Sequence, residues 1–435
     1  MFGIIVLLVA LILFSLLAFK QLNALILAPL VSIFVIVCFK LPILETLKGA
    51  FMPAAANYVS SYFLVFFVGA LFGAVYQFTG AAASIAKTLS KVSRDKFVAP
   101  IIMCITGLLT FGGVSGFVVF FVIYPIALQM FKRANITRRL LPAAISAGCW
   151  TWSMTAPGSP SIQNVIAMTN LGTPSTAAFT PSLIASIVEF VLIFVWLEMR
   201  AKQFTKKGIV FDDPTLRALD PEELEGADED DLPNFIISII PIAVILVCFN
   251  VVKLPVETSV MLGVIVATVT MFKRVKGGIN EWVKVFNKGA ADSGVSILNT
   301  AIVVGFGGVV QNTQGFADLI AKVQGMNISP LVFVAVAVAI CAGACGSASG
   351  GMGVAFNALK DLFVSLGVAP EYIHRVGAIA AGTLDSLPHQ GAQITLLGIC
   401  KTTHKEAYFD IAITQIIIPI ITLFVFIPLA NMGMM

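Results

Sequence analysis

The sequence predicts an all-α polytopic membrane protein, from its composition, its long apolar runs and the placement of its charges. Of its 435 residues, 58% are hydrophobic and only 11% are charged, which is more apolar character than a soluble core can bury. Apolar segments long enough to cross a bilayer recur along the chain, with Lys and Arg clustered between them.

The membrane spans are expected, in chain order, at 2–18, 22–39, 60–80, 140–168, 182–199, 234–250, 256–272, 293–311, 375–399 and 410–430. The first segment lacks a basic region and a small-residue cleavage site, so we expect it to remain as a span and not to be removed as a signal peptide. The seven Cys residues have no CxxC spacing, which favours packing roles over disulfides or a metal site.

Two longer apolar blocks, 97–131 and 329–363, do not fit single spans. Gly and Ser residues interrupt each block near its middle, at 111–116 and at 346–351. Basic residues flank the first block on both sides, so both of its ends are expected in the cytoplasm. Each block is therefore predicted to be a re-entrant hairpin, and the second should enter from the opposite side of the membrane.

An internal repeat supports this opposite entry. Residues recur in the same order about 230 to 235 positions apart, a period typical of two fused halves. In order, Gly73, Gly80, Ala86 and Lys87 match Gly308, Gly315, Ala321 and Lys322. Further along, Gly148, Gln163 and Phe179 match Gly382, Gln393 and Phe409. Each half would contain three spans, a hairpin, a broken span and a final span. An odd number of crossings inverts the second half.

The expected organisation is a first inverted repeat at 1–200, an acidic cytoplasmic linker at 201–233 and a second inverted repeat at 234–435. Both termini would face the periplasm or the cell exterior, and most of the 27 Lys and Arg residues would then be cytoplasmic. The linker is expected to be a solvated tether, with a regulatory role as the alternative. The amphipathic stretches 42–58 and 279–292 are expected to be interfacial arm helices.

Two spans, 140–168 and 375–399, contain residues that interrupt a helix. The interruptions lie at 156–160 and at 384–391, and both contain Pro and Gly. Unwound backbone at membrane depth must be buried in protein or line a wet cavity. Two broken helices and two hairpin tips that meet near the midplane are typical of the binding site of a secondary transporter.

The side chains at these breaks and tips suit a hydroxylated carboxylate. Half-helix N-termini favour anions, and Ser, Thr, Asn and Gln add hydrogen-bond partners. No Lys or Arg is expected in the interior of a span, which favours a monocarboxylate. The residues expected to bind substrate are Ser115, Gly116, Thr155, Pro157, Gly158, Ser159, Gln163, Asn164, Ser347, Ser349, Gly350, Ser386 and Gln390.

Asp385 and His389, four residues apart at the second break, are the expected site of a coupling proton. Two alternatives stay open: Asp385 caps a half-helix while His389 is a neutral donor, or the pair contacts the substrate directly. Glu189 stands alone in a continuous helix, where a structural hydrogen bond or interhelix pair is favoured over a coupling role.

Several passages carry a resemblance to a known family: DEDDLPNF at 228–235, 305–315, the tip at 346–348, and 382 onward into 409–410. On these passages the chain resembles the gluconate permease (GntP) family of the ion-transporter superfamily over nearly its whole length. The resemblance implies proton-coupled uptake of gluconate-like sugar acids or 3-hydroxybutyrate-like hydroxy acids across a bacterial inner membrane. It also implies a homodimer and an elevator mechanism.

Two further transport mechanisms remain open. The Ser/Gly tips resemble those of sodium-coupled dicarboxylate carriers, and a cation/proton antiporter could use Asp385 as its ion site. An enzyme is not expected, because Asp385 and His389 have no Ser or Cys nucleophile or metal-ligand set around them. No cofactor is expected beyond the coupling ion, a proton or else sodium. The expected partners are a small organic acid, the lipid bilayer and a second copy of the chain, with no nucleic acid.

Overall fold

The computed structural model describes residues 2–111, 116–159, 161–220, 232–252, 254–275, 277–325 and 327–435, and every regular element in these ranges is helical. Five of the described helical segments are long and apolar enough to cross a membrane: Phe2–Phe19, Ile43–Phe78, Phe179–Lys206, Ile279–Gln311 and His404–Asn431. The fold is therefore that of an all-α polytopic membrane protein, as the sequence predicts.

The first part of the chain begins with two apolar helices and a longer helical segment. The first two are α1 (Phe2–Phe19) and α2 (Ala24–Cys38). The longer segment runs without a break through α3 (Ile43–Thr46), η1 (Leu47–Phe51) and α4 (Met52–Phe78). After α5 (Ala81–Ser93) come a helical hairpin, an interrupted span and a second long helix. The helical hairpin consists of α6 (Val98–Phe111) and α7 (Gly116–Arg133). The interrupted span consists of η2 (Arg138–Leu140), α8 (Leu141–Trp150), α9 (Trp152–Thr155) and α10 (Ile162–Leu171). The second long helix is α11 (Phe179–Lys206).

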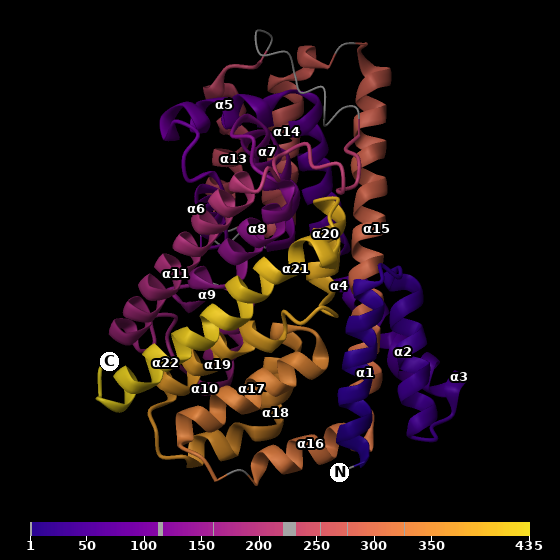
Figure 1. Cartoon of the computed structure of the whole chain (residues 1–435), viewed down its shortest axis with the longest axis vertical. Helices are drawn as coiled ribbons and strands as arrows, with labels where there is room; N and C mark the ends of the chain where they lie inside the picture. The colour runs from indigo at the N-terminus through magenta and orange to yellow at the C-terminus, as the bar shows by residue number, and fades with distance from the viewer. Residues whose placement is uncertain are drawn as a thin grey trace.

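The second part of the chain presents the same kinds of element in the same order. Two short helices and a long one are α13 (Phe235–Asn250), α14 (Val256–Thr270), with η4 (Phe272–Arg274) after it, and α15 (Ile279–Gln311). After α16 (Gln314–Gln324) comes a hairpin of α17 (Pro330–Cys345) and α18 (Ala348–Ser365). The interrupted span consists of α19 (Pro370–Leu384) and α20 (Gly391–Ile399). The chain closes with α21 (His404–Ala412), η5 (Ile413–Ile417) and α22 (Ile418–Asn431) in direct succession. In Figure 1, α15 extends along one edge of the molecule, and both chain termini lie in the lower part of the molecule in this view.

The sequence predicts separate interfacial helices at 42–58 and 279–292, and this prediction is wrong. These stretches are the first turns of the two long helices. No proline separates the second stretch from the span that follows, so its helical hydrogen bonds continue without a break. In the first stretch, Pro53 lies in the first turn of α4, two residues after the π-helical turn η1 ends, and a proline is tolerated in the first turn of a helix because its N–H is not needed there.

The long helices α4 and α15 pack against each other in opposite directions. Gly289, early in α15, lies against Leu71, late in α4, whereas Gly305 lies against Phe51 at the start of α4. Glycine on α15 lets the two backbones approach closely, which is the usual way in which helices associate tightly in a bilayer. The hairpins and interrupted spans pack against this antiparallel pair: α7 contacts α4, and α17 and α20 contact α15.

The linker is not a fully solvated tether. Its described portion, 207–220, contacts both halves of the chain: Arg139 binds Asp213 at 2.7 Å, and Lys401 binds Asp220 at 2.7 Å. The Lys401 ammonium beside Asp220 holds the pKa of that carboxyl below its usual value. The acidic run that follows lies outside the described residues. The linker is therefore tied by ion pairs to η2 and to the turn that follows α20.

The packing of α15 on α4 predicts that Gly308→Ala destabilises the protein. A Cβ at this position would lie 2.6 Å from the Cβ of Ala54 and 2.8 Å from the carbonyl oxygen of Ala50. We expect a loss of about 1 to 3 kcal/mol, the usual effect of overpacking, seen as a lower melting temperature in detergent. The matched control is Gly294→Ala on the same helix, where the added methyl meets nothing within 4 Å. Equal melting temperatures for the two variants would contradict this account of the interface.

Candidate functional site

A cavity of about 340 Å³ lies where the hairpins and the interrupted spans meet. Four helices begin at its wall: α7 at Gly116, α10 at Ser161 and Ile162, α18 at Ser347 and Ala348, and α20 at Gln390 and Gly391. The backbone N–H groups of a first helical turn have no partners within their own helix, and they carry the positive end of the helix dipole. The wall of this cavity therefore favours a negatively charged group.

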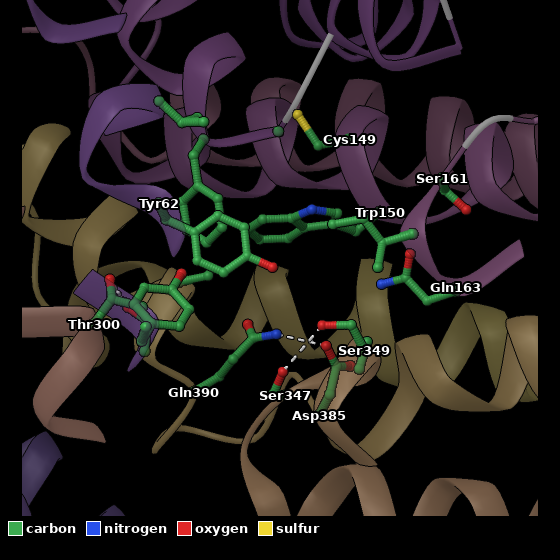
Figure 2. A pocket seen from close by; sticks show the side chains of 18 of the residues that line it. Tyr62, Cys149, Trp150, Ser161, Gln163, Thr300, Ser347, Ser349, Asp385 and Gln390 are labelled. Carbon is green, nitrogen blue, oxygen red and sulfur yellow. Dashed lines mark hydrogen bonds between the residues drawn. The ribbon is translucent and has the colours of Figure 1, made fainter. Parts of the chain in front are cut away.

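The long helices and α8 provide the other wall. Tyr58 and Tyr62 of α4, Thr300 of α15 and Trp150 of α8 line the cavity. In Figure 2 the rings of Tyr62 and Trp150 lie on one side of the space, and the polar groups of Ser347, Ser349, Asp385 and Gln390 lie on the other. The cavity thus has an aromatic wall and a hydrogen-bonding wall, an arrangement suited to a small solute with an apolar face and several oxygens.

Asp385 presents a buried carboxyl to this cavity. Its Oδ2 accepts a hydrogen bond from Nε2 of Gln390 at 2.5 Å, and its Oδ1 accepts one from Oγ of Ser386 at 3.2 Å. The hydroxyls of Ser347 and Ser349 lie 3.5 Å apart at the start of α18, on the same side of the cavity (Figure 2). Among the described residues, Oε1 of Gln390 has no hydrogen-bond partner, so this acceptor is available within the site.

Behind Asp385, a buried polar network joins the second break to the first half of the chain. Gln415, in the π-helical turn η5, donates from Nε2 to Oγ of Ser146 on α8 at 2.5 Å. Its Oε1 accepts from Oγ of Ser386 at 3.3 Å and also from Nε2 of Gln393. A π turn shifts side chains relative to an ordinary helix, and here it directs an amide between the two interrupted spans.

His389 does not accompany Asp385 into the cavity. Its Nε2 lies 2.8 Å from the carbonyl oxygen of Gly343 and, because a carbonyl only accepts, this nitrogen carries a proton. The ring packs on Phe14 and Phe306, and Nδ1 has no partner among the described residues. The imidazole therefore connects the second break to the last turns of α17 and does not face the cavity.

The residues expected to bind substrate divide into two groups. Five of them line the cavity: Gly116, Gln163, Ser347, Ser349 and Gln390. Ser115 lies outside the described residues. The others are not part of the lining: Thr155, Pro157, Gly158, Ser159, Asn164, Gly350 and Ser386.

Asn164 shows why a residue of the first break lies away from the cavity. It is fully buried, its Nδ2 donates to the carbonyl of Met154 at 2.9 Å, and its Oδ1 accepts from Arg375 at 2.6 Å and lies 2.8 Å from Nε2 of His374. Arg375 also donates to the carbonyl of Ala177 at 2.9 Å. Asn164 therefore binds a backbone oxygen beside the first break, and Arg375 binds one in the loop that follows α10.

The environment of Arg375 differs from the sequence expectation, which placed this residue at the outer end of a span. Its side chain is completely buried in α19, and its further acceptors are the carbonyls of Ser175 and Ala156. Since its donors bind protein oxygens and it does not line the cavity, it is not placed to bind a carboxylate solute. The loop that supplies these carbonyls has no sequence signal of its own, so only the folded chain reveals the contact.

Sequence reasoning also missed several residues of the lining. They are Tyr58, Tyr62, Thr110, Glu257 and Thr300. Most lie on continuous helices, where an isolated polar or aromatic side chain gives no sign of facing a site. Among the described residues, the lining contains no Lys or Arg, and its ionisable carboxyls are Asp385 and Glu257.

Comparison with known proteins places the chain in a family. No family model matches it. The sequence is, however, 33% identical over 461 aligned positions to the uncharacterized transporter YxjC of Bacillus subtilis (strain 168), covering 95% of this chain and 96% of that protein. Similarity of this extent agrees with the polytopic helical fold and with a cavity at the interrupted helices. The chain therefore belongs to the same family of membrane transporters as this Bacillus subtilis protein.

Proposed function

We propose that the protein is a secondary active transporter that carries a small hydroxy-monocarboxylate together with protons. A gluconate-like sugar acid or a 3-hydroxybutyrate-like acid is the proposed solute. The observation that supports this most is the convergence of four helix N-termini on one cavity. Because the described lining has no Lys or Arg, dipoles and hydrogen bonds must balance the charge of the solute, which suits one carboxylate better than two or three.

Asp385 is the proposed carrier of a coupling proton. A carboxylate solute and an ionised Asp385 in the same cavity would repel each other strongly at low dielectric. The solute therefore binds better when Asp385 is protonated, and by reciprocity a bound solute favours protonation of Asp385. This mutual preference is the thermodynamic basis of symport. In this scheme His389 holds the second hairpin against the break instead of exchanging the proton itself.

We further propose that 1–200 and 234–435 are inverted repeats, and that the protein works as a homodimer by an elevator motion. The hairpins and interrupted spans would carry the solute past the long helices α4 and α15. The repeated order of elements and the antiparallel packing of these two helices support the proposal. The proposed location is a bacterial cell membrane, with both termini outside and the linker 201–233 in the cytoplasm.

Sodium-coupled symport is the second candidate. The hydroxyls of Ser347 and Ser349 and the side-chain oxygens of Asp385 and Gln390 lie on the same side of the cavity (Figure 2), and hard cations prefer oxygen ligands. A cation/proton antiporter on the same fold would use Asp385 without an organic solute. Both alternatives give results different from proton symport in the transport assay below.

Uptake into liposomes tests the proposed function directly. Purified protein is reconstituted, and uptake of radiolabelled gluconate and 3-hydroxybutyrate is measured under an inward proton gradient and, separately, an inward sodium gradient. We expect proton-driven accumulation of at least one acid without sodium, because protonation of Asp385 removes the charge that opposes solute binding. A strict sodium requirement would replace the proposal with sodium symport. Sodium flux driven by a pH gradient, with no uptake of either acid, would favour antiport.

The variant Asp385→Asn tests the coupling residue. We expect it to retain exchange of labelled for unlabelled solute, since the amide resembles a protonated carboxyl, but to accumulate less solute under a pH gradient. Each proton lost from the cycle lowers accumulation by about tenfold for a gradient of one pH unit. The control is Asp361→Asn, an exposed carboxylate on α18. Undiminished accumulation in Asp385→Asn would remove Asp385 from the coupling role.

Cysteine labelling tests the proposed topology. In a background without the natural cysteines, Lys206→Cys is expected to react with a membrane-impermeant maleimide only after the cells are opened. Gln324→Cys is expected to react in intact cells, because α16 follows the opposite end of α15 from the cytoplasmic loops. Both positions are exposed in the structure. The reverse pattern would show that the protein is inserted the other way round.

A further inference from the structure

Glu189 is a second buried acid, separate from the cavity. It lies within α11, and its side chain is completely buried. Neither carboxyl oxygen has a hydrogen-bond partner of ordinary geometry among the described residues, although the Thr155 hydroxyl lies close enough to stabilise the charged form. Thr155 lies on the short helix α9.

Among the described residues, no opposite charge pairs with this carboxyl. Among the elements packed most extensively on α11, α9 and α22 contain no titratable residue, and α6 and α8 contribute only Cys104 and Cys149. The two arginines of η2 lie beside the linker that follows α11: Arg139 binds Asp213, and Arg138 donates to a linker carbonyl. An ionised carboxylate with no cation and only the Thr155 hydroxyl beside it is strongly disfavoured at membrane depth. In this conformation Glu189 is therefore the neutral acid.

An unpartnered donor lies at the same helix junction. The indole of Trp152, on α9, packs edge-on against Phe190, the residue after Glu189, with ring centroids 5.3 Å apart. It also fills the space over Gly107 of α6, where even a Cβ would collide with it. Its Nε1 is buried and has no hydrogen-bond partner among the described residues. A buried acid and a buried N–H are thus both left unsatisfied where α9 meets α11.

Helix α9 also connects this junction to the cavity. It spans only four residues, between the non-helical Thr151 and the first break. Met154 of α9 and the neighbouring Trp150 line the cavity, whereas Trp152 and Thr155 belong to the contact with α11. A displacement of this short helix would therefore change the wall of the cavity and the surroundings of Glu189 together.

We infer that Glu189 is a second coupling-proton site, linked to the solute through α9. The inference rests on the proposed function for the identity of the solute and deepens it by adding a proton to the cycle. In the described conformation the proton resides on Glu189. When α9 shifts and donates hydrogen bonds from Trp152 Nε1–H and Thr155 Oγ1–H, the carboxylate is stabilised and the proton passes to water. Since the same shift alters the cavity wall, solute binding and proton release are coupled.

The first test is transport by Glu189→Gln in liposomes at zero membrane potential, with gluconate and 3-hydroxybutyrate as probes. This variant is expected to retain solute exchange, which also shows that it folds, but to accumulate about tenfold less solute than the wild type for an inward gradient of one pH unit. The matched control is Glu198→Gln on the same helix, whose carboxylate is paired with Lys202 at the surface. Wild-type accumulation in Glu189→Gln, with the wild type itself active, would overturn the inference and leave the proposed function standing.

The second test does not depend on transport. Infrared spectroscopy of the purified protein detects the carbonyl stretch of a protonated carboxylic acid. A band that is present in the wild type, absent in Glu189→Gln and lost as the pH is raised would support the inference. Trp152→Phe, which keeps the ring but removes the N–H, should shift this loss to higher pH. A Glu189 band that does not respond to pH would identify a structural acid and overturn the inference. If the wild type transports neither acid with protons, the proposed function fails, and the infrared result still decides whether Glu189 exchanges a proton.

Discussion

The constraint on which the rest of this structure depends is the need to pair backbone polar groups at membrane depth. Two spans are interrupted, and each interruption exposes carbonyls that hydrocarbon would leave unsatisfied. At the first break a buried Arg375 donates to the carbonyl of Ala156, and it also donates to the carbonyl of Ala177 in the loop before α11. At the second, His404 bonds to the carbonyl of Pro388 at 2.8 Å and Tyr408 donates to that of Ser386 at 3.0 Å. Side chains from distant helices thus make unwound backbone tolerable.

The helix N-termini lie at the cavity instead, where Ser161 and Ser347 accept hydrogen bonds from first-turn N–H groups of α10 and α18. Since side chains satisfy the carbonyl ends, the N–H ends of α7, α10, α18 and α20 are the polar backbone groups that converge on the cavity. An anion can be held there by dipoles without a fixed cation. The small residues between α4 and α15 contribute indirectly, because close packing of the two long helices places Tyr62 and Thr300 at the opposite wall.

The two buried acids differ in what surrounds them. Asp385 lies at the cavity and accepts hydrogen bonds from Gln390 and Ser386, whereas Glu189 lies behind α9 without a partner among the described residues. Both are uncompensated by a neighbouring cation, so the charge of each depends on what moves near it. A transporter that couples solute to protons needs such groups, because a permanently paired carboxylate would not exchange its proton.

The sequence by itself determined the membrane class and the regions of broken helix, because hydropathy, Pro and Gly act locally and need no knowledge of distant segments. It also indicated Asp385, Gln390 and the serines of α18, since polar residues at a break or a tip are conspicuous in an apolar chain. Only the tertiary structure decided that Asn164 binds Arg375, that His389 faces Phe14 and Phe306, and that Tyr62 and Thr300 reach the cavity. These contacts join residues far apart in the chain, and which way a side chain points depends on how the helices pack, which no local pattern records.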